Sequence, residues 1–344
     1  MSRWVVVLAG GVGSRFWPLS TPQRPKQLLP LVNDAPLLTN ALERLAPLAD
    51  GAHTLILTNA SLTESIAAMA PGIPRANIIA EPQPSGTAAA LAWAAHLIAQ
   101  RDSTTATMIS VHADWAIGDD EGFRLALIQA ARAAEKHQSL VTVGIVPARP
   151  DPGFGYIQPG APVDGVVRRV ERFVEKPDRE RAARMAAEGY LWNSGIFVWR
   201  VGDFLEELRL HCPEVAPVLA AYPDNIANFF AAVTPVAIDI GVMERSARVL
   251  VVPGEFGWDD VGTWGALHRV RAHDAQGNAA NGRVFALDAH RNVVHAEHGD
   301  VVLYGVNDLV VVTHDGLTLV TTTEHSADLK KLLDALPEAL RTRA

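Results

Sequence analysis

A glycine-rich turn followed by two cationic side chains is the stretch of this chain best suited to chemistry. Three glycines within four residues follow a β-branched run at positions 5–8, which predicts a buried strand. Ligands of open α/β sheets bind at the carboxyl ends of strands, and glycines let backbone N–H groups approach phosphate oxygens. Arg15 adds a guanidinium that can grip a phosphate with two hydrogen bonds, and Lys26 adds a point charge. The stretch therefore predicts a polyphosphate site.

Other glycine-loop interpretations fit less well. A P-loop ends in Gly-Lys-Ser/Thr, whereas Ser14-Arg15 follows the last glycine of this turn. A dinucleotide-binding fingerprint needs a third glycine where Phe16 stands, and prolines 18, 22 and 25 interrupt the helix that should follow. An ordinary glycine turn is the remaining alternative, and the cations at positions 15 and 26 argue against it.

Composition excludes several classes of protein. The net charge of −8, from 30 basic and 38 acidic residues, disfavours a nucleic-acid partner, which calls for a basic face. Cys212 is the single cysteine, so internal disulfides and a cysteine-based zinc cluster are excluded, and an inert thiol is expected. No apolar run approaches the roughly 20 residues of a spanning helix. Because the first residues lead directly into a strand, we expect a cytoplasmic protein with no membrane partner.

Apolar periodicity predicts the fold class. Up to about residue 265, β-like runs alternate with helical patterns, which predicts an α/β fold with a mostly parallel, Rossmann-like sheet flanked by helices. Strands are expected at 54–58, 77–80, 106–111, 140–145, 166–174, 192–199 and 249–252, and helices at 36–48, 88–100 and 119–137. After about residue 275, short β runs predict a small solenoid or sandwich, closed by a helix at 327–340. The histidines there lack metal-ligand spacing and are expected in turns.

Acidic side chains follow several of the predicted strands. Asp114 comes directly after the strand at 106–111, where a carboxylate suits Mg²⁺, although such a residue is more often a helix cap or a turn residue. Glu175 and Lys176 end the strand at 166–174 and suit a phosphorylated sugar, or else form an exposed ion pair worth well below about 1 kcal/mol.

The motifs resemble one known family. Residues 9–20, with Pro25-Lys26-Gln27, resemble the signature of the sugar-1-phosphate nucleotidyltransferases, in particular their mannose-1-phosphate guanylyltransferase branch. Further blocks of that branch follow in order at residues 81–88, 173–177, 192–197 and 258–264. The loop at 82–86, His112 and Trp115 depart from the usual pattern of the branch. The resemblance covers residues 3 to about 340.

The resemblance implies roles for particular residues. Arg15, Lys26, Asp114 and Asp260 are the implied catalytic residues, and Asp114 and Asp260 the implied ligands of Mg²⁺. The implied nucleotide-binding residues are Leu8, Gly10, Gly11, Gly13, Ser14, Arg15, Lys26, Glu81, Gly86 and Thr87. Ser85 or Thr87 is also a candidate cap for the helix at 88–100. Asp259 is expected to be a solvated neighbour of Asp260.

The implied sugar-binding residues are Gly155, Tyr156, Glu175, Lys176, Asn193 and Asp239. Tyr156 suits either a sugar contact or a core aromatic position. The resemblance also implies two domains, a catalytic domain at 1–270 and a short left-handed β-helix at 275–344 that offers a surface for a homodimer.

The implied reaction is transfer of GMP from GTP to α-D-mannose 1-phosphate, which yields GDP-mannose and pyrophosphate. The same chemistry with UTP or dTTP and glucose 1-phosphate is an alternative, and a catalytically silent sensor of nucleotide sugars is another. A dehydrogenase is remote because the dinucleotide fingerprint is missing.

Overall fold

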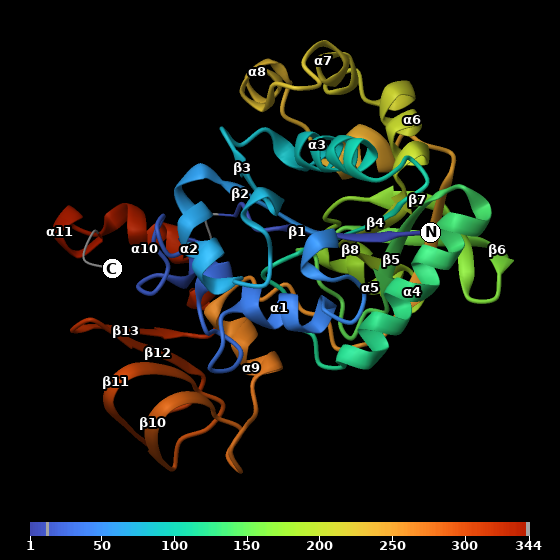
Figure 1. Cartoon of the computed structure of the whole chain (residues 1–344). Coiled ribbons are helices and arrows are strands. Elements are labelled where there is room, and N and C mark those ends of the chain that lie inside the picture. Colours follow the sequence, from blue (N-terminus) through green and yellow to red (C-terminus); the bar gives the residue numbers. More distant parts are fainter. Residues whose placement is uncertain (12–13, 342–344) are drawn as a thin grey trace. The chain divides into compact units, whose positions relative to one another are not determined.

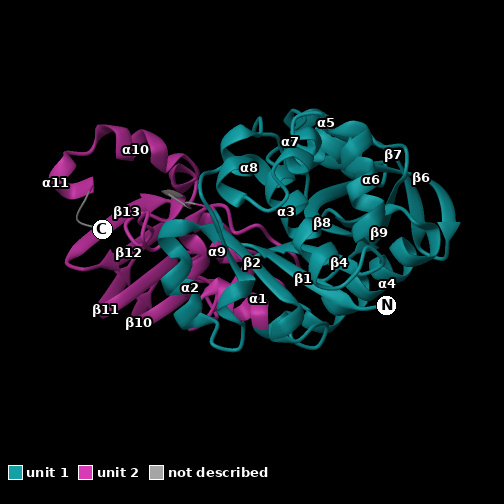
Figure 2. Cartoon of the chain, turned by 45° about the horizontal axis from the view of Figure 1, so that its top comes forward, with its two compact units in different colours: residues 1–10, 43–112, 119–256 teal, residues 11–42, 113–118, 257–344 magenta. Residues whose placement is uncertain are grey.

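The computed structural model describes residues 1–11 and 14–341, apart from the side chain of Ser14. The chain divides into two compact units, coloured separately in Figure 2. Unit 1 comprises Met1–Gly10, Glu43–His112 and Asp119–Phe256. Unit 2 comprises Gly11–Leu42, Ala113–Gly118 and Gly257–Ala344. The two are described separately below.

Unit 1 is built on a nine-stranded sheet with the order β3-β2-β1-β4-β8-β5-β9-β7-β6. Its strands are β1 (Arg3–Leu8), β2 (Thr54–Asn59), β3 (Ile78–Glu81), β4 (Thr107–His112), β5 (Leu140–Ile145), β6 (Tyr156–Asp164), β7 (Val167–Val174), β8 (Leu191–Arg200) and β9 (Val249–Gly254). Within the described residues, β7 and β8 run opposite to the other strands of this sheet. The predicted mostly parallel α/β sheet is thereby confirmed.

Helices cover both faces of this sheet, as Figure 1 shows for α3 and α4. Successive side chains of a strand point to opposite faces of the sheet. Val6, Met108 and Trp199 therefore pack in one core with α3 and α6, while the residues next to them in each strand face the other side. The helices of the chain up to β9 are α1 (Leu37–Leu45), α2 (Thr63–Met69), α3 (Gly86–Arg101), α4 (Asp120–His137), α5 (Arg179–Ala187), α6 (Val201–His211), α7 (Ala216–Ala221) and α8 (Ile226–Ala232), followed by a π-helical turn at Asp239–Met243.

Local sequence explains where the two longest helices form. Seven alanines give α3 high helix propensity, and this helix is buried along most of its length. Asp119 caps α4, because its carboxylate accepts hydrogen bonds from the backbone N–H groups of Glu121 and Gly122. Cys212, after α6, is buried, and burial raises the pKa of its thiol to about 11, which disfavours the reactive thiolate.

Unit 2 has its own apolar core. Phe16, Trp17 and Leu31 from the first part of the chain pack with Trp264 and with Val310 of the C-terminal sheet. The indole of Trp264 donates a hydrogen bond of 3.0 Å to the backbone oxygen of Trp17. A short helix, α9 (Leu267–Val270), follows Trp264. This core fixes the segment that carries Lys26.

The C-terminal sheet has the order β10-β11-β12-β13, with strands β10 (Ala279–Leu287), β11 (Val293–Tyr304), β12 (Leu309–His314) and β13 (Leu317–Thr322). β10, β11 and β12 are parallel, and β13 pairs antiparallel with β12. Buried Asn292 joins successive coils, because its amide bonds Asn278 Oδ1 at 2.9 Å and the backbone oxygen of Val306 at 3.0 Å. Parallel strands stacked with such buried corners are a solenoid arrangement, not a sandwich.

Two expectations about the C-terminal part were wrong. The helix expected at 327–340 is split into α10 (Leu329–Ala335) and α11 (Glu338–Arg341), because Pro337 cannot continue the hydrogen bonding of a helix. His295, His298 and His314 lie in strands rather than turns, and His295 is buried.

Among the helices of residues 1–11 and 14–341, none combines the length and the apolar character that crossing a membrane requires.

Candidate active site

Lys26 lies at the centre of a charged cluster in unit 2. Its side chain is only 9% exposed, although lysine is almost never buried without a partner. Its ammonium donates to Asp114 Oδ2 at 3.0 Å and to the backbone oxygen of Asp260. The structure thus brings together three of the residues that the sequence singled out for catalysis.

A backbone bridge holds the two acidic loops in register. Ala116 and Asp259 exchange backbone hydrogen bonds of 2.9 and 3.0 Å, so Asp114 and Asp260 each lie within two residues of this bridge. Asp259 is not the solvated neighbour that the sequence suggested. It is 5% exposed, accepts two hydrogen bonds from Arg269 and one from the backbone N–H of Val261. Its role is to fix the loop.

The residue after Asp260 has an uncommon backbone conformation. Val261 has a φ of 48°, which β-branched residues rarely adopt, and its side chain is fully buried in the core of unit 2. The Asp259 carboxylate holds its N–H at 2.9 Å. Burial raises the pKa of Asp260, and the charge of Lys26 partly offsets this effect.

The cluster fits a divalent cation. Lys26 bonds the Asp114 carboxylate and the backbone oxygen of Asp260, and the charge of Asp114 contributes to the raised pKa of Asp260. In the described ranges, 1–11 and 14–341, no three His, Cys, Asp or Glu side chains form a metal cage. Mg²⁺ is commonly held by one or two carboxylates together with substrate phosphates, so a pair of aspartates is a suitable donor set.

The glycine turn is held by a residue that the sequence analysis did not single out. Gln27 is 2% exposed, and its amide donates to the backbone oxygen of Gly11 at 3.0 Å. Its place directly after Lys26, in the block Pro25-Lys26-Gln27, was the sequence signal that could have identified it. Arg15 lies in a short 3-10 turn, Ser14–Phe16, and is exposed. Gly13 and the side chain of Ser14 lie outside the described residues.

Unit 1 carries Leu8, Gly10, Glu81, Gly86 and Thr87, which are predicted to bind the nucleotide. Leu8 ends β1, and Gly10 lies so close to Glu81 that a Cβ there would be 3.8 Å from Glu81 Oε1. Burial raises the pKa of Glu81 to about 7. This carboxyl group therefore titrates near neutral pH, as groups at functional sites often do.

The beginning of α3 is fixed to a distant segment of unit 1. Thr87 Oγ1 accepts a hydrogen bond of 2.9 Å from the backbone N–H of Ile238, next to Asp239. Ser85 donates to the backbone oxygen of Phe230 at 3.1 Å. Ser85, one of the two predicted caps, occupies the N-cap position of α3, but its side chain makes no capping hydrogen bond, because the Ser85 and Thr87 hydroxyls bind this segment instead.

Gly86 is expected to tolerate no side chain. Its φ is 82°, and a Cβ would lie 2.4 Å from the backbone oxygen of Val236. Gly86→Ala should therefore lower the free energy of unfolding by about 3 kcal/mol through backbone strain and overpacking. Urea denaturation would measure this loss. Gly189 has the same φ of 82° but open space where a Cβ would lie. Gly189→Ala should therefore lower the free energy of unfolding much less, and the difference between the two variants gives the steric part of the loss at Gly86.

The predicted sugar residues meet in a second group in unit 1. Asn193 Nδ2 donates to Asp239 Oδ1 at 2.6 Å, and its backbone N–H donates to the oxygen of Gly155 at 2.8 Å. A Cβ on Gly155 would lie 3.0 Å from Glu175 Oε2. Burial raises the pKa of Asp239, an effect opposed by Asn193 and by the nearby charge of His112. The sequence analysis did not assign His112 to this group.

Two of the predicted sugar residues have other surroundings. Tyr156 is fully buried, and its hydroxyl bonds the backbone N–H and oxygen of Asp151 at 3.0 and 3.1 Å, so it takes the core alternative. Lys176 lies 3.1 Å from Glu175 in an exposed ion pair, and its φ is 37°. Its ammonium is open to solvent.

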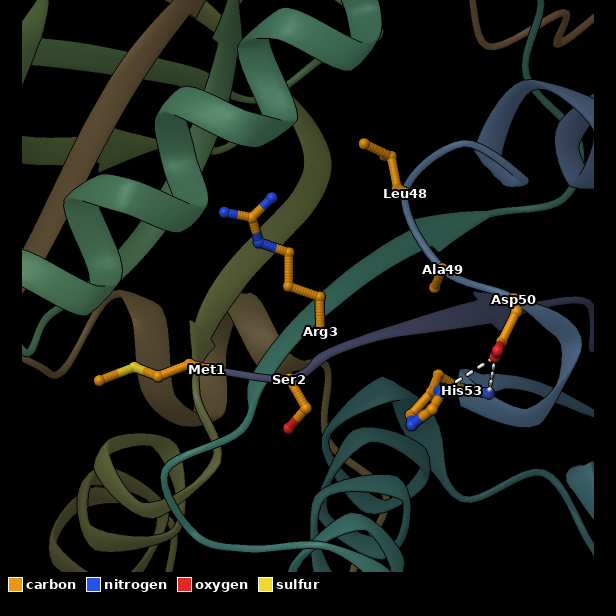
Figure 3. A pocket seen from close by; sticks show the side chains of 7 residues that line it. All are labelled: Met1, Ser2, Arg3, Leu48, Ala49, Asp50 and His53. Atoms are coloured by element: carbon orange, nitrogen blue, oxygen red, sulfur yellow. Dashed lines mark hydrogen bonds and ion pairs between the residues drawn. The ribbon is translucent and has the colours of Figure 1, made fainter.

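A pocket of about 320 Å³ lies elsewhere in unit 1, at the amino ends of β1 and β2 (Figure 3). His53 Nδ1 is 2.7 Å from Asp50 Oδ1, while the Arg3 guanidinium points away from this pair. The pocket contains none of the predicted site residues. We do not assign it to the reaction.

Comparison with known proteins defines the class. The Nucleotidyl transferase family model matches residues 4–277, and the MannoseP isomerase/GMP-like beta-helix domain matches residues 282–336. The chain belongs to the nucleotidyl transferase family and is a nucleotidyltransferase with a C-terminal β-helix domain. Enzymes of this family generally use a divalent metal.

Its relatives narrow the class. The chain is 38% identical to mannose-1-phosphate guanylyltransferase of Escherichia coli K12, over 96% of this chain and 73% of that protein. It is 37% identical to the alginate biosynthesis protein AlgA of Pseudomonas aeruginosa, over 96% of this chain and 71% of that protein. A structure titled mannose-1-phosphate geranyltransferase, from Thermus thermophilus, superposes with a TM-score of 0.91 at 36% identity and covers 97% of this chain and 99% of that one.

Proposed function

We propose that this enzyme transfers GMP from GTP to α-D-mannose 1-phosphate and releases pyrophosphate, so that GDP-mannose forms. The observation that carries the proposal is the cluster of Lys26, Asp114 and Asp260, which suits phosphate chemistry. Similarity to mannose-1-phosphate guanylyltransferases along nearly the whole chain supports the choice of base and sugar.

The chain's own groups have distinct tasks in this reaction. A sugar phosphate is an anion at neutral pH, since its second pKa is about 6, so it can attack the α-phosphorus without a general base. Lys26 neutralises charge on the α-phosphate, and Arg15 stabilises the departing pyrophosphate. Backbone N–H groups of the glycine turn assist. Catalysis is therefore positioning and electrostatic stabilisation.

The two aspartates have a second task. Asp114 and Asp260 would hold Mg²⁺, which when bound supplies charge neutralisation and a template for the reacting phosphates. Lys26 links the two loops that carry these aspartates, because it bonds the Asp114 carboxylate and the backbone oxygen of Asp260. This arrangement preorganises the donors before substrate binds.

Residues of unit 1 would bind the nucleotide and the sugar phosphate. Glu81, with Leu8, Gly10, Gly86 and Thr87, is assigned to the nucleotide. Gly155, Glu175, Asn193 and Asp239 are assigned to the sugar phosphate, with Lys176 as an added charge. We further propose that residues 1–270 form the catalytic domain and residues 275–344 the β-helix domain, which offers a surface for a second copy of the chain.

The assignment of Glu81 predicts a pH dependence. Because its pKa is about 7, Glu81 is mostly neutral at pH 6 and mostly a carboxylate at pH 8. Only the carboxylate can accept both N–H groups of a guanine edge, so KM for GTP should fall about tenfold between pH 6 and pH 8. Steady-state kinetics at the two pH values measure it. Glu81→Gln should remove this dependence, and an equally steep dependence in that variant would refute the assignment.

Pyrophosphate release tests the proposed function. GTP, ATP, UTP and dTTP are each paired with mannose, glucose and N-acetylglucosamine 1-phosphates, with and without Mg²⁺. We expect release with GTP and mannose 1-phosphate, and only with Mg²⁺. Release with another pair alone would keep the chemistry and overturn the substrates, whereas no release from folded protein would favour a silent sensor.

A further inference from the structure

The segment that carries Lys26 is attached to the C-terminal sheet on both sides of the lysine. Before Lys26, Arg24 Nη2 donates to Glu297 Oε1 of β11 at 3.2 Å. After it, the backbone oxygen of Leu31 accepts a hydrogen bond of 2.6 Å from Arg271 Nε. All of these residues belong to unit 2.

The attachment through Arg271 is buried. Arg271 is 6% exposed, and its guanidinium also bonds the backbone oxygen of Val294 at 3.0 Å and His295 Nδ1 at 2.9 Å, both on β11. A buried guanidinium that serves three acceptors in fixed directions is a rigid link. Leu31 is thereby linked to the beginning of β11.

The attachment through Glu297 is closer to the lysine. Thr21 and Arg24 close a tight turn with reciprocal backbone hydrogen bonds of 3.1 Å, and Pro25 follows in an extended conformation. Proline allows little backbone rotation, so a shift of Arg24 is passed to Lys26 two residues later. The carboxylate that holds Arg24 therefore influences where the ammonium of Lys26 lies.

Glu297 is itself held in place. Its Oε2 lies 2.6 Å from His314 Nδ1 on β12, and its side chain is 19% exposed. Burial favours the neutral form, but the hydrogen bond with His314 and the charge of Arg24 keep the pKa of Glu297 below its usual range. It therefore remains a carboxylate that can orient Arg24.

We propose that Glu297 is a positioning residue for the transfer reaction: through Arg24 it sets Lys26 against Asp114 and Asp260. The C-terminal sheet is then part of the catalytic machinery, not an appendage. This inference rests on the proposed function, because the role of Lys26 defines what is positioned. Misplacement of a catalytic group by about 1 Å can cost up to about a hundredfold in rate.

Steady-state kinetics of the full chain test the inference. Glu297→Ala should lower kcat about tenfold, with KM for mannose 1-phosphate within about threefold of wild type. Glu297→Gln retains one acceptor for Arg24 and should recover about half of the loss on a logarithmic scale. In an Arg24→Ala background, Glu297→Ala should have no further effect, because the two act as one unit. Asp300→Asn is the matched control, since Asp300 on β11 forms an exposed ion pair with Arg283 of β10 and its loss should leave kcat unchanged.

Thermal melting of each variant separates misplacement from unfolding. The inference holds if kcat falls in variants that melt as the wild type does. The inference is overturned if Glu297→Ala keeps the wild-type kcat. It is also overturned if Glu297→Ala lowers kcat as much in the Arg24→Ala background as in the wild type, or if Glu297→Gln lowers kcat as much as Glu297→Ala does. Wild-type protein that releases no pyrophosphate would instead overturn the proposed function, so the two failures are distinguishable.

Discussion

Asp114→Asn will lower kcat for pyrophosphate release about a thousandfold while the protein remains folded. Asparagine has nearly the same shape and keeps an oxygen that can accept the hydrogen bond from Lys26, now 3.0 Å from the carboxylate. What it lacks is the negative charge that suits Mg²⁺. The change therefore removes the ligand without emptying the site. Rates with saturating GTP and mannose 1-phosphate measure the effect.

The matched control is Asp315→Asn, in an exposed turn of the same unit. Its φ of 45° is one that asparagine adopts readily, so we expect unchanged activity. Calorimetric titration with Mg²⁺ and GTP gives a second readout, in which Asp114→Asn should weaken the binding of the metal. An Asp114→Asn enzyme within about threefold of the wild-type kcat would remove this carboxylate from the account.

The second large effect is expected at Lys26. Lys26→Met keeps most of the buried stem and removes the charge, and kcat should fall by about a hundredfold to a thousandfold, because a preorganised cation at the reacting phosphate is lost. The substitution also removes the hydrogen bonds from the ammonium to the Asp114 carboxylate and to the backbone oxygen of Asp260. Pyrophosphate release from saturating substrates gives the size of the loss.

The loss of folding stability in Lys26→Met should depend on pH. Lys26 now lowers the pKa of Asp260, which burial raises, so Lys26→Met should raise the pKa further above its unfolded value. A raised folded pKa stabilises at low pH and loses that contribution as the pH rises through it. Lys26→Met should therefore lose more stability relative to wild type at pH 8 than at pH 5, as urea denaturation would show. The control is Lys331→Met, on the exposed face of α10, which should lose no stability at either pH. An equal loss of stability in Lys26→Met at both pH values would argue against the electrostatic coupling of Lys26 and Asp260.

Periodicity identified most of the fold because the central strands of unit 1, such as β1, β4 and β5, are buried on both faces. Continuous apolar runs such as 140–145 leave few alternatives, and β5 has these same bounds. The C-terminal helix was less predictable, since its helical pattern continues through Pro337, where the backbone cannot. The buried position of His295 depends on Arg271, which is 24 residues away in the chain, and local sequence carries no signal of that contact.

The candidate site was likewise predictable in part from local sequence and in part not. Types and spacing identified Lys26, Asp114 and Asp260, which the structure places together. Asp259 looked like a solvated neighbour because its partner Arg269 lies ten residues later, in α9. Glu297 was missed because its effect on Lys26 passes through Arg24, 273 residues earlier in the chain. Such indirect contacts follow from tertiary packing and not from motifs.

One isotopic measurement tests the central claim most directly. Mannose 1-phosphate with ¹⁸O in the three terminal phosphate oxygens is incubated with the enzyme, GTP and Mg²⁺, and the products are separated by mass. Attack of the sugar phosphate on the α-phosphorus predicts GDP-mannose that carries all three labelled oxygens, and pyrophosphate that carries none. Labelled pyrophosphate, or GDP-mannose without the label, would contradict the mechanism, and the absence of GDP-mannose would contradict the function itself.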